Sequence, residues 1–138
     1  MIRQALPVKA CDVAAAWPQV LGLIETALSK SDGGHTAEDV RKACLSGDAQ
    51  LWCGIERSAI AIIMVTEIRK QPRLKAMRIW LMAGSDAAEW IAARSAAIEE
   101  WAAKSGCSRL EMVGRKGWLR RLPGWSPTNV VMSKELRP

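Results

Sequence analysis

The chain has 138 residues and a mass of 15.1 kDa, enough for one domain with a single continuous core, so we expect residues 1–138 to form one domain. No apolar run approaches the roughly 20 residues of a membrane-spanning helix, and Met1–Gln4 do not begin a signal peptide, which favours a cytoplasmic protein without membrane contact. Four scattered cysteines and one histidine argue against disulfides and against a conventional metal site.

The charge of the chain is unevenly distributed. The net charge is +6, and residues 61–138 contain 14 Lys and Arg against 7 Asp and Glu, whereas residues 1–60 contain 6 against 7. Two clusters hold much of the excess: Arg69–Lys75 with Arg78, and Arg109 with Arg115, Lys116, Arg120 and Arg121. Such clusters attract the phosphates of a cofactor or of nucleic acid, but solvated arginines that keep a small protein soluble are the commoner explanation.

The first third of the chain is predicted to form a short strand and then helices. Ile2–Val8 alternates weakly between polar and apolar residues, as a strand does. Pro18 is expected to interrupt the next helix and to begin a new one, because proline fits the first helical position. Thr36 and Asp39 have the spacing of a capping box, which begins another helix, and Gly47 is expected to end it.

A hairpin and a further strand are predicted next. Gln50–Glu56 and Ala59–Ile68 are separated by Arg57 and Ser58, a spacing that suits a two-residue turn. The first seven residues of the second strand are all apolar, so this strand should lie inside the sheet with both faces covered. Ala76–Ala83 is expected to form the neighbouring strand.

The remaining chain alternates between helices and strands. Asp86–Ser105 is predicted to be the longest helix, because its apolar residues recur at helical spacing and Gly106 follows it. Ser108–Val113 is then a strand, Gly114–Leu122 a short basic helix, and Asn129–Leu136 the closing strand of the sheet.

This order of elements resembles the GNAT superfamily of N-acetyltransferases over most of the chain. Residues 98–112, IEEWAAKSGCSRLEM, resemble the passage from the long helix to the fifth strand of that superfamily. Gly114–Trp118 with Leu122, and Val131–Leu136, look more like the small acetyltransferase-like proteins of tailed phages. The resemblance implies a mixed α/β fold whose central, mostly antiparallel sheet has about six or seven strands and is flanked by helices.

The resemblance also implies a binding site for acetyl-CoA or CoA. In the superfamily, a Q/R-x-x-G-x-G/A segment offers backbone N–H groups to the pyrophosphate of the coenzyme. The matching segment here is Leu81–Asp86, in which only Gly84 agrees with the pattern, so the segment is degenerate. We expect the side chain of Asp86 to cap the following helix and to occupy the N–H groups that the ligand would use. The residues placed near the coenzyme are Gly84, Ser85, Asp86, Ala87 and Ala88.

Acetyl transfer to an amine needs a base that deprotonates the ammonium group, and commonly an acid that protonates the leaving thiolate. Two strand carboxylates, Glu67 and Glu111, are the candidate bases, although an exposed strand carboxylate is the commoner explanation for both. The acid in the superfamily is often a tyrosine, and this chain has none. His35 lies in a loop that in the superfamily borders the acceptor site, but a solvated loop residue is again the commoner explanation.

Three functions follow from these observations. The first is an acyl-CoA-dependent N-acyltransferase of phage type whose activity is weak or lost. The second is a non-catalytic phage structural, assembly or host-interaction protein, located in the host cytoplasm or on the virion. It would bind a protein partner through a surface rich in arginine around one tryptophan, as in many binding hot spots: Arg115, Lys116, Trp118, Arg120 and Arg121. Nucleic-acid binding through the two basic clusters is the third.

Overall fold

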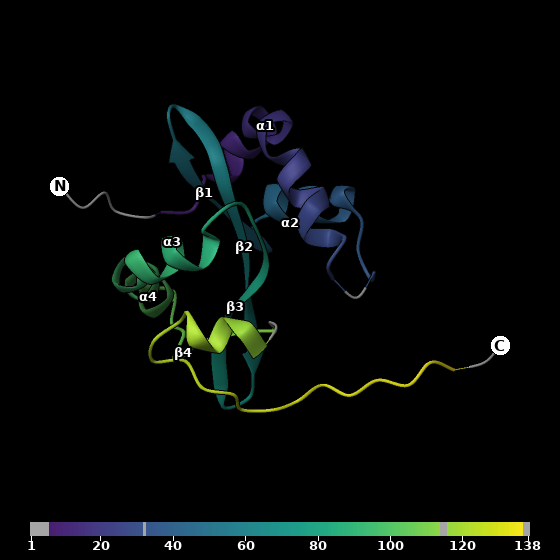
Figure 1. Ribbon diagram of the computed structural model, residues 1–138, viewed down its shortest axis with the longest axis vertical. Coiled ribbons are helices and arrows are strands. Elements are labelled where there is room, and N and C mark those ends of the chain that lie inside the picture. Colours follow the sequence, from purple (N-terminus) through teal and green to yellow (C-terminus); the bar gives the residue numbers. More distant parts are fainter. Residues whose placement is uncertain (1–5, 32, 114–115, 137–138) are drawn as a thin grey trace.

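A four-stranded mixed sheet lies at the centre of the structure, a computed structural model that describes residues 6–31, 33–113 and 116–136 (Figure 1). The strands lie in sequence order: β1 (Ala49–Glu56), β2 (Ala59–Gln71), β3 (Leu74–Ala83) and β4 (Arg109–Met112). The first three are antiparallel neighbours, and β4 pairs with β3 in parallel. The hairpin prediction is confirmed, with Arg57 and Ser58 both at positive φ in its turn.

The expected six or seven strands are therefore reduced to four in the described chain. At the amino end, the predicted strand Ile2–Val8 falls partly outside the described residues, and Val8 forms a single bridge to Leu51. At the carboxyl end, Asn129–Leu136 forms no strand, because this segment runs away from the sheet and its backbone finds no neighbour among the described residues (Figure 1).

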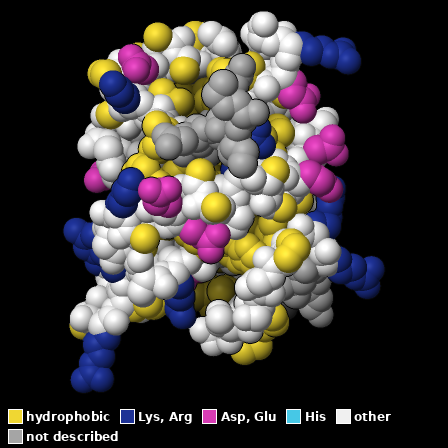
Figure 2. All heavy atoms as spheres, turned by 90° about the vertical axis from the view of Figure 1, so that its left-hand side faces the viewer, with side chains coloured by type: hydrophobic (Ala, Val, Ile, Leu, Met, Phe, Trp, Pro, Cys, Tyr) yellow, Lys and Arg dark blue, Asp and Glu magenta, His cyan; other side chains and the backbone are white. Residues whose placement is uncertain are grey.

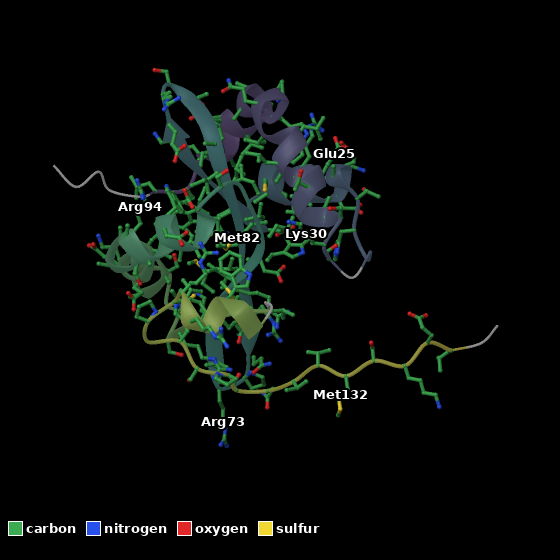
Figure 3. The ribbon with its side chains drawn as sticks, viewed as in Figure 1. Glu25, Lys30, Arg73, Met82, Arg94 and Met132 are labelled. Atoms are coloured by element: carbon green, nitrogen blue, oxygen red, sulfur yellow. The ribbon has the colours of Figure 1, made fainter. Side chains whose placement is uncertain are left out.

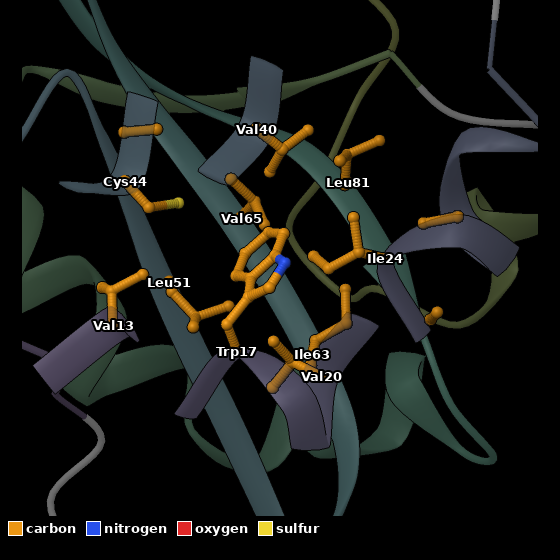
Figure 4. Packing of buried hydrophobic residues seen from close by; sticks show 13 residues of the cluster. Val13, Trp17, Val20, Ile24, Val40, Cys44, Leu51, Ile63, Val65 and Leu81 are labelled. Carbon is orange, nitrogen blue, oxygen red and sulfur yellow. The ribbon is translucent and has the colours of Figure 1, made fainter. Parts of the chain in front are cut away.

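Two helices cover one face of the sheet. α1 (Ala10–Leu28) is continuous, so the expected interruption at Pro18 is wrong. A proline inside a helix costs about 3 kcal/mol, whereas burying one large apolar side chain contributes about 1.5–3 kcal/mol. Trp17 before the proline, and Val20 and Ile24 after it, are buried in one core cluster (Figure 4). Burial on both sides of Pro18 thus outweighs its cost.

The second helix of this layer, α2 (Ala37–Ser46), begins with the predicted capping box. The Asp39 N–H donates to Thr36 Oγ1 at 3.3 Å, and the Thr36 N–H donates to Asp39 Oδ2 at 2.8 Å. The N–H of Thr36 and its hydroxyl group both donate to the Asp39 carboxylate, and these two bonds hold the pKa of that carboxyl below its usual value. Gly47 ends the helix at φ +87, as expected.

The other face of the sheet is covered by α3 (Ala87–Ala93), α4 (Ser95–Lys104) and the 3-10 helix η1 (Lys116–Arg120). The single long helix expected over Asp86–Ser105 is thus broken at Arg94, which leaves helical geometry at φ −110 and ψ 13. The Arg94 guanidinium bonds back to the carbonyl oxygen of Trp90 and lies 4.8 Å from the Trp90 ring centroid. These contacts hold the side chain against the end of α3.

The core has two parts, one on each face of β2, which confirms that this strand is covered on both sides. Ile63 and Val65 point toward α1 and α2, whereas Ile62 and Met64 point toward α3 and α4. None of the helices in the described residues is both long and apolar enough to cross a bilayer.

Candidate active site

The parallel strands β3 and β4 part shortly after they pair. Their last paired residues are Ile79 and Met112. The next residue of β3, Trp80, is the extra residue of a β-bulge opposite Val65 and Thr66 of β2. A bulge bends its strand and redirects the side chains that follow it. The end of β3 therefore diverges from the chain that leaves β4.

A pocket of about 540 Å³ opens at this divergence. Its walls come from the end of β3, the start of α3, the end of β4, η1, the last turn of α1 and the loop after it. Crevices beyond the carboxyl ends of parallel strands are the usual ligand sites of α/β sheets. The pocket is lined by six side chains that are charged or titratable: Lys30, His35, Glu67, Arg78, Asp86 and Arg121.

The turn predicted to hold the coenzyme lies at this pocket. Gly84, Asp86, Ala87 and Ala88 line it, whereas Ser85 is exposed outside the lining. Gly84 has φ +119, and a Cβ atom there would overlap the carbonyl oxygen of Ala61. The glycine is therefore required for the turn to pack closely against β2.

Asp86 does not cap α3 with its side chain, so that expectation is wrong. Its backbone is left-handed, at φ 58 and ψ 31, rather than extended as a side-chain cap requires. Its carbonyl oxygen accepts the Trp90 N–H at 2.9 Å, and the residue is part of the pocket lining. The side chain thus leaves the first N–H groups of α3 unoccupied but brings a negative charge to the pocket.

The structure separates the two candidate bases. Glu67 of β2 lines the pocket, and its carboxylate has no hydrogen bond or ion pair with the described part of the chain. Glu111 of β4 is 20% exposed and lies among three guanidinium groups: Arg69 Nη1 at 2.5 Å, Arg78 Nε at 3.5 Å and Arg109 Nη2 at 3.5 Å. Of the two, only Glu67 lines the pocket.

Two residues outside the predicted set also form the pocket wall. The exposed ring of His35, on the loop after α1, meets the ring of Trp80 edge-on, with the centroids 4.8 Å apart and the planes at 73°. His35 could be identified as the single histidine of a glycine-rich loop. Trp80 gave no signal, because its position depends on a bulge that the strand pattern does not reveal.

The predicted partner surface around Trp118 is closely connected with the pocket. Trp118 is half-buried, packs against the core on the α3 side and lines the pocket. Arg121 also lines it, and its Nε donates to Glu89 Oε1 at 3.1 Å across to α3. This bond from Arg121 holds the pKa of the Glu89 carboxyl below its usual value. Trp118 and Arg121 thus join η1 to the site.

Of the other residues of the predicted partner surface, Arg120 is not part of the pocket lining. Arg120 is exposed, Lys116 begins η1, and Arg115 lies outside the described residues. The face that carries α3 and α4 bears acidic and basic side chains interspersed (Figure 2). The basic excess of the second half is therefore not gathered into one continuous patch on that face.

Comparison with known proteins gives matches in structure alone. No protein-family model matches the sequence, and no curated protein matches it. An aminoglycoside acetyltransferase from an uncultured soil metagenomic sample, in complex with sisomicin, is similar at 12% identity and a TM-score of 0.66, over 96% of this chain and 95% of that one.

Two further structures are similar over 96% of this chain and 97% of theirs, each at 16% identity. They are a GNAT family acetyltransferase from Staphylococcus aureus, with a TM-score of 0.62, and glucosamine-6-phosphate N-acetyltransferase from Arabidopsis thaliana, with a TM-score of 0.60. The chain therefore has the fold of the GNAT acetyltransferases.

Proposed function

We propose that the chain is an N-acyltransferase that uses an acyl-coenzyme A. The observation that carries the proposal is the pocket at the parting of β3 and β4, which gathers an unpaired carboxylate, Glu67, and several cations. A base and a site for phosphates are what acyl transfer from this coenzyme to an amine requires.

The lining of the pocket includes groups that fit an anionic coenzyme. Lys30 has no ion pair with the described chain and brings a positive charge that favours phosphate groups, whereas the charges of Arg78 and Arg121 are partly offset by Glu111 and Glu89. The first N–H groups of α3 are not occupied by the side chain of Asp86. Arg121, Lys30 and the turn at Gly84 would hold the coenzyme, which supplies an activated acyl thioester when it is bound. The carboxylate of Asp86 is the one lining group beside this turn that opposes phosphate.

Glu67 is assigned the role of general base. Its carboxylate accepts a proton from the ammonium group of the acceptor, so that the nitrogen lone pair becomes available to attack the acyl carbon. The nitrogen would attack the thioester carbonyl carbon to form the C–N bond, the C–S bond would break with its electron pair on sulfur, and the second proton lost by the nitrogen would neutralise the thiolate. His35 and Trp80 form the wall on the side of Glu67 and position the acceptor.

The acceptor itself is assigned only as an amine. Two of the structures with this fold are named for an aminoglycoside and for glucosamine-6-phosphate, so the fold is compatible with different acceptors. The pocket contains both cations and carboxylates, which suits an acceptor with an ammonium group beside Glu67.

Binding of CoA tests the proposal directly. A ligand at a hundred times its dissociation constant stabilises a protein by about 2.7 kcal/mol, so thermal unfolding should shift upward with CoA or acetyl-CoA. Arg121→Gln should reduce the shift, whereas Arg120→Gln, a neighbouring arginine outside the lining, should not. An unchanged melting temperature at millimolar CoA would refute the proposal.

Two observations favour a second function, in which the fold is kept and catalysis is lost. The acidic residue Asp86 lines the pocket, and the chain has no tyrosine to protonate a leaving thiolate. In that case the chain would be a phage-type assembly or host-interaction protein in the host cytoplasm or on the virion, with a protein partner. Recovery of the protein as a stoichiometric component of a purified particle supports this function, and turnover of acetyl-CoA excludes it.

Nucleic-acid binding has the least support of the three candidate functions. Arg69, Arg78 and Arg109 of the two basic clusters are already engaged by Glu111, so they are less available to phosphates. Binding through the remaining cations would decrease steeply as salt rises.

A further inference from the structure

Charged side chains from three strands meet on the sheet face that is turned away from α3 and α4. The register places them in two neighbouring rows across β2, β3 and β4: Glu67, Arg78 and Glu111 in the first row, and Arg69, Ala76 and Arg109 in the second. The residues that alternate with them, such as Met77 and Leu110, point to the opposite face and pack with α3 and α4. Arg69, Arg78 and Arg109, here called the arginine cluster, therefore lie together on one face.

Helices α1 and α2 leave this part of β2 and β3 uncovered. In their core cluster, the residues from β2 end at Val65 and those from β3 start at Trp80, so on these two strands the cluster stops short of both rows. The side chains of Arg69, Arg78 and Arg109 are 36%, 30% and 45% exposed. The arginine cluster is thus open to a ligand.

Glu111 holds the arginine cluster together but does not neutralise it. Its carboxylate lies 2.5 Å from Arg69 Nη1 and 3.5 Å from both Arg78 Nε and Arg109 Nη2. One carboxylate balances one of the three guanidinium charges, so two positive charges remain in excess. The contact with Arg78 is not a hydrogen bond, and Arg78 Nε is buried without a hydrogen-bond partner in the described chain. The Arg78 guanidinium is therefore not saturated by its own chain.

Arg78 also connects the arginine cluster with the proposed base. Arg78 and Glu67 both line the pocket, and they are register partners in antiparallel strands, whose Cβ atoms lie about 4.5–5.5 Å apart. No ion pair joins these two described side chains, since Arg78 is turned to Glu111. A negative and a positive group thus lie side by side at the pocket, and each can still bind a ligand.

We propose that the acceptor is an amine that also carries an anionic group, a phosphate or a carboxylate. This substrate class rests on the acyl transfer proposed above. The ammonium group of the acceptor binds to Glu67, and its anionic group binds to the arginine cluster, whose planar guanidinium groups match the oxygens of either anion. Because the arginine cluster converges on one point, it suits a single anionic group better than the run of phosphates in a nucleic acid.

The dissociation constants of matched amines for the CoA-bound protein test this substrate class, and NMR titration of the ¹⁵N-labelled protein measures them without turnover. The pairs are phosphoethanolamine with ethanolamine, 4-aminobutyrate with 4-aminobutyramide, and 6-aminohexanoate with 6-aminohexanamide. In one pair or more, the anionic amine should bind about tenfold more tightly or better, as expected for a charge-assisted hydrogen bond. A preference in the first pair alone indicates a phosphate, and a preference in the other pairs indicates a carboxylate.

Variants of two arginines show where the anionic group binds. Arg78→Gln should remove most of the preference, and Arg78→Lys, which keeps the charge, should retain more of it. Arg73 is exposed in the turn between β2 and β3 and projects away from the body of the molecule (Figure 3). Arg73→Gln removes the same charge and should leave the preference within about twofold, as surface substitutions usually do. A dissociation constant does not depend on the folded fraction, so partial unfolding of a variant does not mimic the loss.

The remaining outcomes overturn the substrate class. Equal dissociation constants within every pair do so, as does a failure of every amine to bind, while a thermal shift with CoA still supports the transferase. A full preference in Arg78→Gln, or an equal loss in Arg73→Gln, shows that the arginine cluster does not bind the anionic group. An absent thermal shift with CoA overturns both the transferase and the substrate class.

Discussion

His35 lies edge-on against Trp80, with the ring centroids 4.8 Å apart, although 45 positions separate the two residues in the sequence. The loop after α1 contributes the first ring, and the bulge in β3 contributes the second. The contact therefore holds a loop against the strand that opens the pocket, which Glu67 also lines. It links the layer of α1 and α2 to the candidate chemistry.

Replacing His35 by Ala should lower acceptor turnover with little change in CoA binding. The imidazole is exposed and its main contact is the ring of Trp80, so the free energy of unfolding should fall by no more than about 0.5–1.5 kcal/mol. Steady-state kinetics with an amine panel and urea unfolding measure the two effects. His35→Phe retains a ring against Trp80 and serves as the control, and loss of the CoA thermal shift in His35→Ala would contradict this assignment.

Gly84→Ala should destabilise the fold far more than Gly124→Ala. Both glycines have positive φ, +119 and +86, which alone costs an L-residue about 1–2 kcal/mol. At Gly84 the new methyl also meets the backbone of β2, an overpacking that typically costs a further 1–3 kcal/mol, whereas the space at Gly124 is open. Urea unfolding of both variants compares them, and equal losses would show that the turn moves away from β2.

Local signals in the sequence were sufficient for several elements. The capping box of Thr36 and Asp39 is complete within four residues, and its partners need nothing from the rest of the chain. The apolar run of β2 predicts burial on both faces, because no single-faced arrangement would cover it. A helical connection also separates β3 from β4, which is the kind of connection that parallel strands need.

The predictions that were wrong concern residues whose structure depends on contacts far away in the sequence. Pro18 is tolerated because side chains on both sides of it enter one core cluster, which propensity cannot show. Asp86 has the residue type of a helix cap, but the close packing of Gly84 on β2 gives the turn a different path. The pocket itself depends on the bulge at Trp80, and a bulge leaves the apolar pattern of a strand nearly unchanged. The sequence therefore predicted the turn at Gly84 as part of the site, but it did not predict the pocket wall that Trp80 forms.

The four cysteines should differ in their rate of alkylation. Burial raises the pKa of the Cys44 and Cys53 thiols to about 11, and it also raises the pKa of Cys107. A raised pKa means less thiolate at a given pH, and at pH 8 a thiol with pKa 11 is roughly one part in a thousand ionised. Cys11 is exposed and should react first with iodoacetamide. Mass spectrometry after short labelling checks the order, and urea should abolish the difference; early labelling of Cys44 in the native protein would contradict it.

Glu67→Gln and Glu111→Gln should have opposite effects on activity and on stability. Glu67 has no partner in the described chain, so its amide variant should keep the fold and the CoA thermal shift, while kcat falls by about 10²–10⁴ as for the loss of a general base. Glu111 lies between three arginines, and its neutralisation leaves their charges unbalanced, which should cost about 1–2 kcal/mol given its partial exposure. Turnover per folded molecule should then be nearly unchanged in Glu111→Gln. Kinetics and urea unfolding on the same preparations separate the two roles, and a Glu67→Gln variant with full kcat would remove Glu67 from the chemistry.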